Sequence, residues 1–132
     1  MAGPPSLAEC FVHLGLGGRA ESQPPFDGFE WYEGYGKRAA ADGKDGWLVS
    51  QHSFSESWDS WEMHPAGAEV VLCLAGRMTL HQEHADGSSD RAELDPGEYA
   101  INPPGTWHTA DVYGEATALF ITCGEGTEHR PR

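Results

Sequence analysis

Short turn signals divide this chain at close intervals and limit the length of the elements that it can form. Asp-Gly or Pro-Gly pairs occur six times between residues 27 and 105. Segments that could form strands lie between and after these turns, over residues 29–35, 47–54, 70–83 and 116–123. Short strands separated by such turns are typical of a sandwich or barrel, so we predict an all-β fold.

Helical signals are weak by comparison. No segment of helical length shows a sustained apolar period near 3.6 residues. The best candidate for a helix start is residues 6–9, which have capping-box spacing, although residues 11–14 could equally form an added edge strand. A length of 132 residues is typical of one domain, so we expect a single domain over 1–132, with 1–25 as an N-terminal extension or edge strand.

The charge balance excludes some classes of partner. The chain carries 8 Lys and Arg against 21 Asp and Glu, a formal net charge of −13, with no basic run. Such a surface repels phosphate groups, so we expect no nucleic-acid or membrane partner. The N-terminal segment resembles neither a secretory signal nor a membrane span, and three cysteines argue against a disulfide framework. These features predict a cytoplasmic protein.

Four side chains that can bind a metal come from two separate segments. Glu62 and His64 are two residues apart in an aromatic-rich stretch, and such residues project from the same face of a strand. Residues 65–68 are short enough to form a turn that brings Glu69 back beside them. His108 follows a second turn. Imidazole nitrogen and carboxylate oxygen together suit Mn, Fe, Co, Ni or Zn better than Mg or Ca.

The two segments resemble the two motifs of the cupin superfamily. The first family motif runs G-x5-H-x-H-x(3,4)-E-x6-G, and the second runs G-x5-P-x-G-x2-H-x3-N. The matching positions are Glu62, His64, Glu69 and Gly76 within residues 57–76, and Gly97, Pro103, Gly105, His108 and Val112 within residues 97–112. The spacings agree, but Glu62 stands where the family usually has its first His, and Val112 replaces the final Asn. The resemblance covers about residues 57–123.

This resemblance implies a cupin-type double-stranded β-helix, or jelly-roll barrel. It also implies that His64, Glu69 and His108 are metal ligands, that Glu62 occupies the fourth ligand position, and that the cofactor is one divalent transition metal, Mn, Fe, Zn or Ni. We therefore expect a metal-dependent enzyme that acts on a small organic molecule. Two alternatives stay open: a non-catalytic cupin that binds or senses a small ligand, and a degenerate cupin without metal.

A substrate pocket is expected on the inward face of the strands. Strand alternation predicts that Tyr99 and Ile101 share this face with Met78, and that Cys73 shares the face of Glu69, four residues before it. We therefore predict a pocket formed by Cys73, Met78, Tyr99 and Ile101. For Cys73 the alternative is a small buried hydrophobic residue without a role in binding.

Other aromatic and histidine residues are expected outside the site. Trp61 and Trp107 each lie one residue from a predicted ligand and so should face the exterior, where they could pack against a second subunit of a homodimer. His81 and His84 flank a hairpin and are predicted to lie at the surface. His129 belongs to a polar tail and is not expected to be catalytic.

Overall fold

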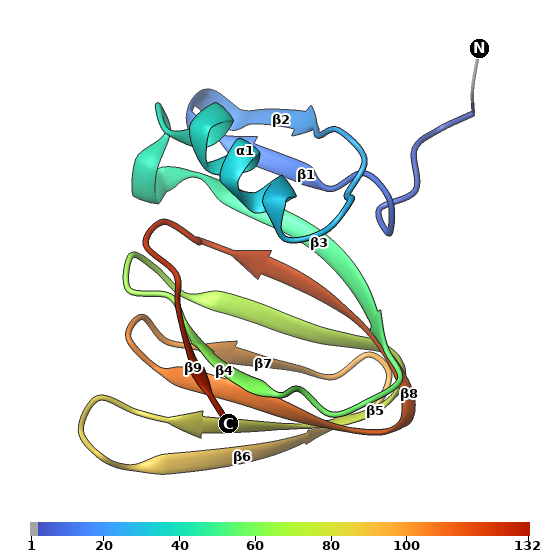
Figure 1. Cartoon of the computed structure of the whole chain (residues 1–132), viewed down its shortest axis with the longest axis vertical. Coiled ribbons are helices and arrows are strands. Elements are labelled where there is room, and N and C mark those ends of the chain that lie inside the picture. The colour runs from blue at the N-terminus through green and yellow to red at the C-terminus, as the bar shows by residue number, and fades with distance from the viewer. Residues whose placement is uncertain (1–2) are drawn as a thin grey trace.

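Nine strands and one α-helix make up the computed structural model, which describes residues 3–132 (Figure 1). The strands are β1 (Val12–Gly15), β2 (Arg19–Ser22), β3 (Trp47–Phe54), β4 (Ser60–Met63), β5 (Glu69–Glu83), β6 (Ser89–Leu94), β7 (Tyr99–Asn102), β8 (Trp107–Thr122) and β9 (Glu128–Pro131). The helices are α1 (Glu30–Ala39) and two short 3-10 helices, Leu16–Gly18 and Gly43–Asp45.

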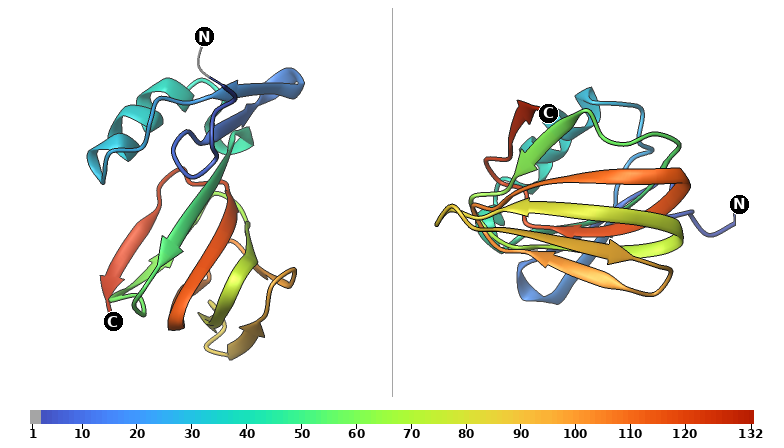
Figure 2. Two further views of the ribbon diagram at one scale, coloured as in Figure 1. Left: turned by 90° about the vertical axis from the view of Figure 1, so that its right-hand side faces the viewer. Right: turned by 90° about the horizontal axis from the view of Figure 1, so that it is seen from below.

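The two longest strands, β5 and β8, pair antiparallel and join two walls of the molecule (Figure 2). In one wall the first half of β5 lies between β7 and the last half of β8. The last half of β8 pairs in turn with β3, and β3 pairs with β1. In the other wall the second half of β5 pairs with β6, and the first half of β8 pairs with β4, which pairs with β9. The predicted all-β jelly roll is confirmed.

The passage of β5 from one wall to the other depends on Gly76. The pairing of β5 with β8 shifts register between Cys73 and Ala75 and again between Gly76 and Met78. Gly76 has a φ of 72°, and a Cβ atom placed on it would lie 2.0 Å from the backbone oxygen of Glu115. Only glycine fits this close backbone approach, which gives a structural reason for the glycine that ends the first motif.

Inward-facing side chains of both walls form one hydrophobic core. Alternate positions of β5 and β8 supply most of it, as the period of a strand requires. Its buried members are Val71, Cys73, Met78, Leu80, Leu94, Ala110, Val112, Ala116, Ala118 and Phe120. Burial of each large side chain stabilises the fold by about 1.5–3 kcal/mol, so this core holds the two walls at a fixed separation.

The N-terminal strands extend the β3 side of the sheet. β1 pairs with β3 on one side and with β2 on the other, so residues 12–14 lie in a strand and not in a helix, although β2, and not β1, is the edge of the sheet. Residues 6–10 form only a turn, in which the Ser6 carbonyl accepts from the Cys10 amide at 2.8 Å. A second small cluster of Phe11, Trp31 and Leu48 packs α1 against these strands.

The strand expected near residues 29–35 is wrong, because α1 occupies this region. Trp31 and Tyr35 lie one helical turn apart and stack with ring centroids 5.3 Å apart. Acidic residues in the first turn and basic residues in the last turn suit the helix dipole. Two glycines within the segment interrupt the apolar period that would have indicated a helix. No helix within residues 3–132 has the length and apolar character needed to cross a membrane.

A buried carboxylate ties α1 to the N-terminal strands. Asp42 accepts from Arg19 Nη2 at 2.8 Å and from the Leu16 amide at 3.2 Å, and it lies 2.6 Å from His13 Nε2. The other ring nitrogen of His13 is 2.7 Å from the Tyr35 hydroxyl on α1. The hydrogen bonds from Arg19 and then His13 hold the pKa of Asp42 well below its usual range. This network is a structural anchor for the helix.

Candidate metal centre

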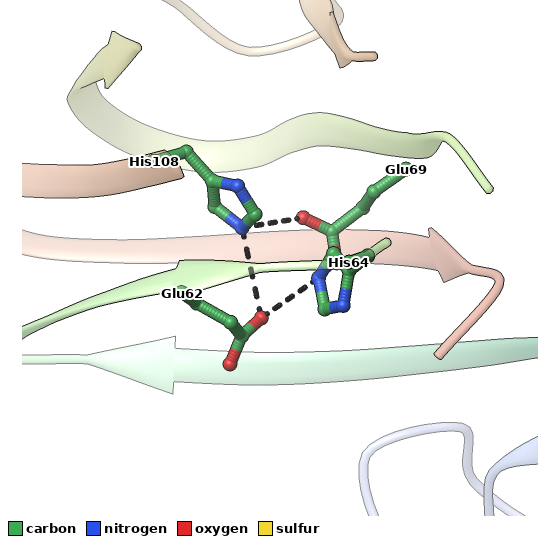
Figure 3. A group of neighbouring side chains, drawn as sticks. All are labelled: Glu62, His64, Glu69 and His108. Carbon is green, nitrogen blue, oxygen red and sulfur yellow. Dashed lines mark ion pairs between the residues drawn. The ribbon is translucent and has the colours of Figure 1, made fainter. Parts of the chain in front are cut away.

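The structure brings the four predicted ligands together, with side chains that point toward one another (Figure 3). Glu62 lies on β4, His64 directly follows β4, Glu69 begins β5, and His108 lies at the start of β8. One potential ligand atom from each residue lies within 4.8 Å of all the others. The bends at residues 65–67 reverse the chain and return Glu69 to the cluster, as the sequence predicted.

Cross-strand register explains how remote residues meet. Glu62 on β4 lies directly opposite His108 on β8 and opposite His129 on β9, so the three share one row across that wall. Glu69 approaches from the other wall, where its direct cross-strand partners are Asn102 on β7 and Thr122 on β8. The cluster therefore joins both walls of the barrel.

Backbone and hydroxyl groups fix which nitrogen of each imidazole carries a proton. The hydroxyl of Thr127 donates to the Gly124 carbonyl at 2.7 Å, so it accepts from His64 Nδ1 at 2.8 Å. In the same way His108 Nδ1 donates to the Thr106 carbonyl at 3.3 Å. In the neutral imidazoles, Nε2 then carries a lone pair, and both Nε2 atoms face the carboxylates.

The two carboxylates have different surroundings. Glu69 has a side chain only 3% exposed, and it accepts from Asn102 Nδ2 at 3.1 Å and from the Thr122 hydroxyl at 2.6 Å. The Glu62 side chain is 30% exposed and directs Oε1 into the cluster, while Oε2 lies 3.0 Å from His129 Nε2. Glu62 therefore forms the side of the cluster nearest to solvent.

The contacts within the cluster are short but are not aligned as hydrogen bonds. His64 Nε2 lies 3.0 Å from Glu62 Oε1 and 3.1 Å from Glu69 Oε2, and His108 Nε2 lies 3.1 Å from Glu69 Oε1. Both Nε2 atoms are buried, yet neither has a hydrogen-bond partner within residues 3–132. Buried polar atoms are rarely left in this state. Nitrogen and oxygen atoms that face a shared centre are arranged as metal ligands are.

The protonation states of the four residues are interdependent. Burial lowers the pKa of His64 and His108, but the carboxylates outweigh burial and raise both pKa values to about 9. Burial raises the pKa of Glu69, but the imidazoles outweigh it and lower the pKa to about 2; the pKa of Glu62 is also lowered. Protonation of both imidazoles would balance the charge of the two carboxylates in the absence of a cation. A divalent cation would replace two of these protons.

The four residues of the predicted substrate pocket do not lie together. Cys73 and Met78 are fully buried in the hydrophobic core, whereas Tyr99 is 63% exposed and Ile101 is 52% exposed. The prediction that Tyr99 and Ile101 face inward is therefore wrong. The side chain of Asn102 points inward and donates to Glu69. Because side chains alternate along β7, those of Tyr99 and Ile101 point to the exterior.

Aromatic side chains border the cluster, and sequence reasoning did not assign them to the site. Trp58 packs with its ring centroid 6.4 Å from that of His108 and 6.1 Å from that of Phe120. Its Nε1 is buried without a hydrogen-bond partner in the described part of the chain. His52, which lies on β3, contacts the ring of Phe120, and its Nε2 lies 3.2 Å from the Tyr32 hydroxyl on α1. Burial, then the charges of the two cluster glutamates, raise the pKa of Tyr32 to about 12.

Residues predicted to lie outside the cluster do so. Arg130 lies over the rings of Trp61 and Trp107, 5.1 Å and 4.5 Å from their centroids. His81 lies 2.8 Å from Asp111, and His84 lies 2.8 Å from Asp90. His129 belongs to a polar tail, but β9 pairs with β4 and brings its half-exposed side chain to Glu62. No local signal in the polar C-terminal segment indicates this long-range pairing.

Comparison with known proteins shows similarity at the level of structure. No protein-family model and no curated protein matches the sequence. Recombinant oxalate oxidase in complex with glycolate is similar at a TM-score of 0.55 and 15% identity, over 62% of this chain and 45% of that chain. Peruvianin-I, a cysteine peptidase from Thevetia peruviana latex, is similar at a TM-score of 0.53 and 19% identity, over 62% and 54%.

A third solved structure is the hydroquinone 1,2-dioxygenase PnpCD in complex with Cd2+ and 4-hydroxybenzonitrile. It matches at a TM-score of 0.50 and 12% identity, over 58% of this chain and 56% of that chain. The matches thus span about half the length of these three solved chains. At such identities the likeness establishes a shared fold and not a shared chemistry.

Proposed function

We propose that this chain, which has the cupin fold, binds one divalent transition metal ion through His64, Glu69 and His108, with Glu62 as a fourth ligand. One observation carries the proposal. Two buried imidazoles have their Nδ1 atoms bonded to other groups, and their Nε2 atoms face two carboxylates without an aligned hydrogen bond. A set of two nitrogen and two oxygen donors suits Mn, Fe, Ni or Zn.

We further propose that the bound ion serves a reaction on a small organic molecule. Four protein ligands leave up to two positions of an octahedral site for substrate or water, and the ion would polarise a bound carbonyl or hydroxyl oxygen. A substrate would approach on the Glu62 side, which is the more exposed side of the cluster. Beside His108, the buried N–H of Trp58 is available to donate to a substrate oxygen, and Phe54 and Phe120, which pack against Trp58, would exclude water.

A second candidate is a cupin without metal, in which the same four residues form a closed ionic cluster. The pKa values of about 9 for both histidines favour it, because at neutral pH two imidazolium groups would balance the two carboxylates. The unaligned contacts count against it, since charged hydrogen bonds are normally well aligned and short. Metal content therefore separates the two candidates.

The test of the proposed function uses protein purified without chelator. We expect about one transition-metal ion per chain, and turnover of a small carboxylic acid or phenol only in the metal-loaded protein. Oxalate, glycolate and hydroquinone are suitable first compounds, followed by enolic and sugar-like molecules, with O2 uptake and product formation as readouts. Bound metal without turnover across the panel would favour a binding or sensing protein, and absence of metal would overturn the proposal.

The substitution Glu62→His tests the role of Glu62. Histidine restores the residue that the cupin motif usually has at this position. If Glu62 is a ligand, the variant should keep its metal but shift its preference toward Ni or Cu, because a third imidazole makes the site richer in nitrogen. Competition between Mn and Ni, followed by metal analysis, measures the shift. An unchanged preference would show that Glu62 does not coordinate the ion.

A further inference from the structure

Residues 124–132, which we call the C-terminal segment, contact two of the four predicted metal ligands. The Thr127 hydroxyl accepts from His64 Nδ1 at 2.8 Å, and His129 Nε2 lies 3.0 Å from Glu62 Oε2. Each contact is made to the atom that faces away from the cluster, because His64 Nε2 and Glu62 Oε1 face into it. Groups placed in this way orient a metal ligand without binding the ion themselves.

The same segment holds the tryptophan that borders the cluster. Arg132 Nη1 donates to the Trp58 carbonyl at 3.1 Å and to the Ala110 carbonyl at 3.2 Å. The Arg132 amide donates to the Asp59 carbonyl at 3.1 Å. Because the Trp58 ring packs beside His108, one short stretch of chain contacts the cluster residues and their aromatic border together.

The attachment of the C-terminal segment to the barrel is narrow. β9 has four residues, three of them exposed, and it pairs with β4 at one end of the strand order (Figure 1). Arg130 lies over the rings of Trp61 and Trp107 and bonds to the Glu83 carboxylate. Such contacts contribute little where they are exposed, so the segment should open at a lower free-energy cost than the whole fold.

We propose that Thr127 and His129 are positioning residues of the metal centre, and that metal binding is coupled to the docking of the C-terminal segment on β4. This inference rests on the proposed metal binding. With the segment docked, the His64 ring is held in one orientation and Glu62 directs Oε1 into the cluster. With the segment open, both side chains are free to rotate, and the binding of an ion then has to order them.

Such a coupling acts in both directions. If docking raises the affinity for the ion by a given factor, the bound ion raises the docking equilibrium by the same factor. Loss of a group that orients a ligand lowers metal affinity about 10–100-fold. The bound ion should therefore make opening of the C-terminal segment at least about 10-fold less frequent.

The first test measures the affinity of the full chain for Co²⁺ by competition with a chelator. Thr127→Val removes the hydroxyl but retains the shape of the side chain, and it should lower the affinity at least about 10-fold. Thr127→Ser, which retains the hydroxyl, should restore the wild-type affinity. The matched control is Thr117→Val, because the Thr117 hydroxyl bonds to Ser53, away from the cluster. The control should bind Co²⁺ as the wild type does.

The absorption spectrum of bound Co²⁺ provides a second readout for the same variants, because it depends on the arrangement of the ligands. Thr127→Val should change this spectrum and Thr127→Ser should not. A role of Thr127 in stability alone would leave the spectrum of the folded, metal-bound variant unchanged.

The second test needs no substitution. Hydrogen exchange of the backbone amides in the C-terminal segment is measured in the wild-type chain by mass spectrometry, with and without saturating Co²⁺. Exchange in this segment should be at least about 10-fold slower with the ion. β6 is the internal control, since it is also an edge strand with exposed residues, and its Arg91 bonds to Glu93 on the same strand. Its exchange rate should not change.

Two results would overturn the coupling and leave the proposed metal binding in place. One is a folded Thr127→Val variant with wild-type affinity and spectrum. The other is a metal-bound wild-type chain in which the C-terminal segment exchanges as fast as it does without the ion. A wild-type chain that binds no Co²⁺ would overturn the proposed function, and this inference with it.

Discussion

Replacement of His108 by alanine is expected to abolish metal binding. The side chain of His108 is fully buried, and its Nε2 lies 3.1 Å from Glu69 Oε1 in the cluster. Without the His108 nitrogen, only three protein ligands remain for the ion. Loss of groups that only orient a ligand lowers metal affinity about 10–100-fold, so loss of the ligand itself should cost at least about 100-fold. Bound metal should fall below about a tenth of the wild-type content.

His81→Ala is the matched control for this substitution. His81 also contacts a carboxylate, that of Asp111. It lies on β5 as well, but its side chain points away from the cluster. The control should keep wild-type metal content. Thermal melts add a second readout, because a ligand at 100 times its dissociation constant stabilises the folded state by about 2.7 kcal/mol. Added metal should raise the melting temperature of wild type and His81→Ala but not of His108→Ala. Full metal content in a folded His108→Ala protein would contradict the assignment.

Gly76→Ala is expected to be strongly destabilising. The new Cβ would lie 2.0 Å from the Glu115 backbone oxygen and 2.9 Å from the Ala116 Cα, and backbone atoms cannot rotate away as a side chain can. Alanine at a φ of 72° adds roughly 1–2 kcal/mol of backbone strain, and overpacking typically adds 1–3 kcal/mol. A total of about 3 kcal/mol or more is a large part of the stability of a small domain.

Gly97→Ala separates steric crowding from backbone strain. Gly97 also has a positive φ, 90°, but a Cβ atom there meets nothing within 4 Å. This control should lose only the strain part, about 1–2 kcal/mol. Chemical denaturation with fluorescence detection measures both variants. Equal losses for the two variants would show that the close approach of Gly76 to Glu115 is not important for stability.

The sequence predicted correctly those features that depend on residues close together in the chain. The same-face relation of Glu62 and His64, the turn after His64, and Trp47–Phe54 as a strand all follow from local pattern and are present in the structure. The resemblance of the two motifs to those of the cupin superfamily also implied the jelly roll. Local periodicity is reliable here because one face of each strand has to be buried.

The features that sequence reasoning missed depend on pairings between distant segments. Tyr99 and Ile101 face outward because Asn102 on the same strand bonds to Glu69, thirty-three residues away in the chain. His129 reaches Glu62 only because β9 pairs with β4. Alternation within one strand gives two equivalent choices of face, and only the register with its neighbours selects between them.

Anomalous diffraction from crystals of protein purified without chelator tests the metal site most directly. We predict one anomalous peak at about 2.0–2.3 Å from His64 Nε2, His108 Nε2 and a carboxylate oxygen of Glu69, with Glu62 Oε1 as the fourth ligand atom. The metal site would be contradicted if no peak lay at this position and both imidazoles instead donated aligned hydrogen bonds to the two carboxylates.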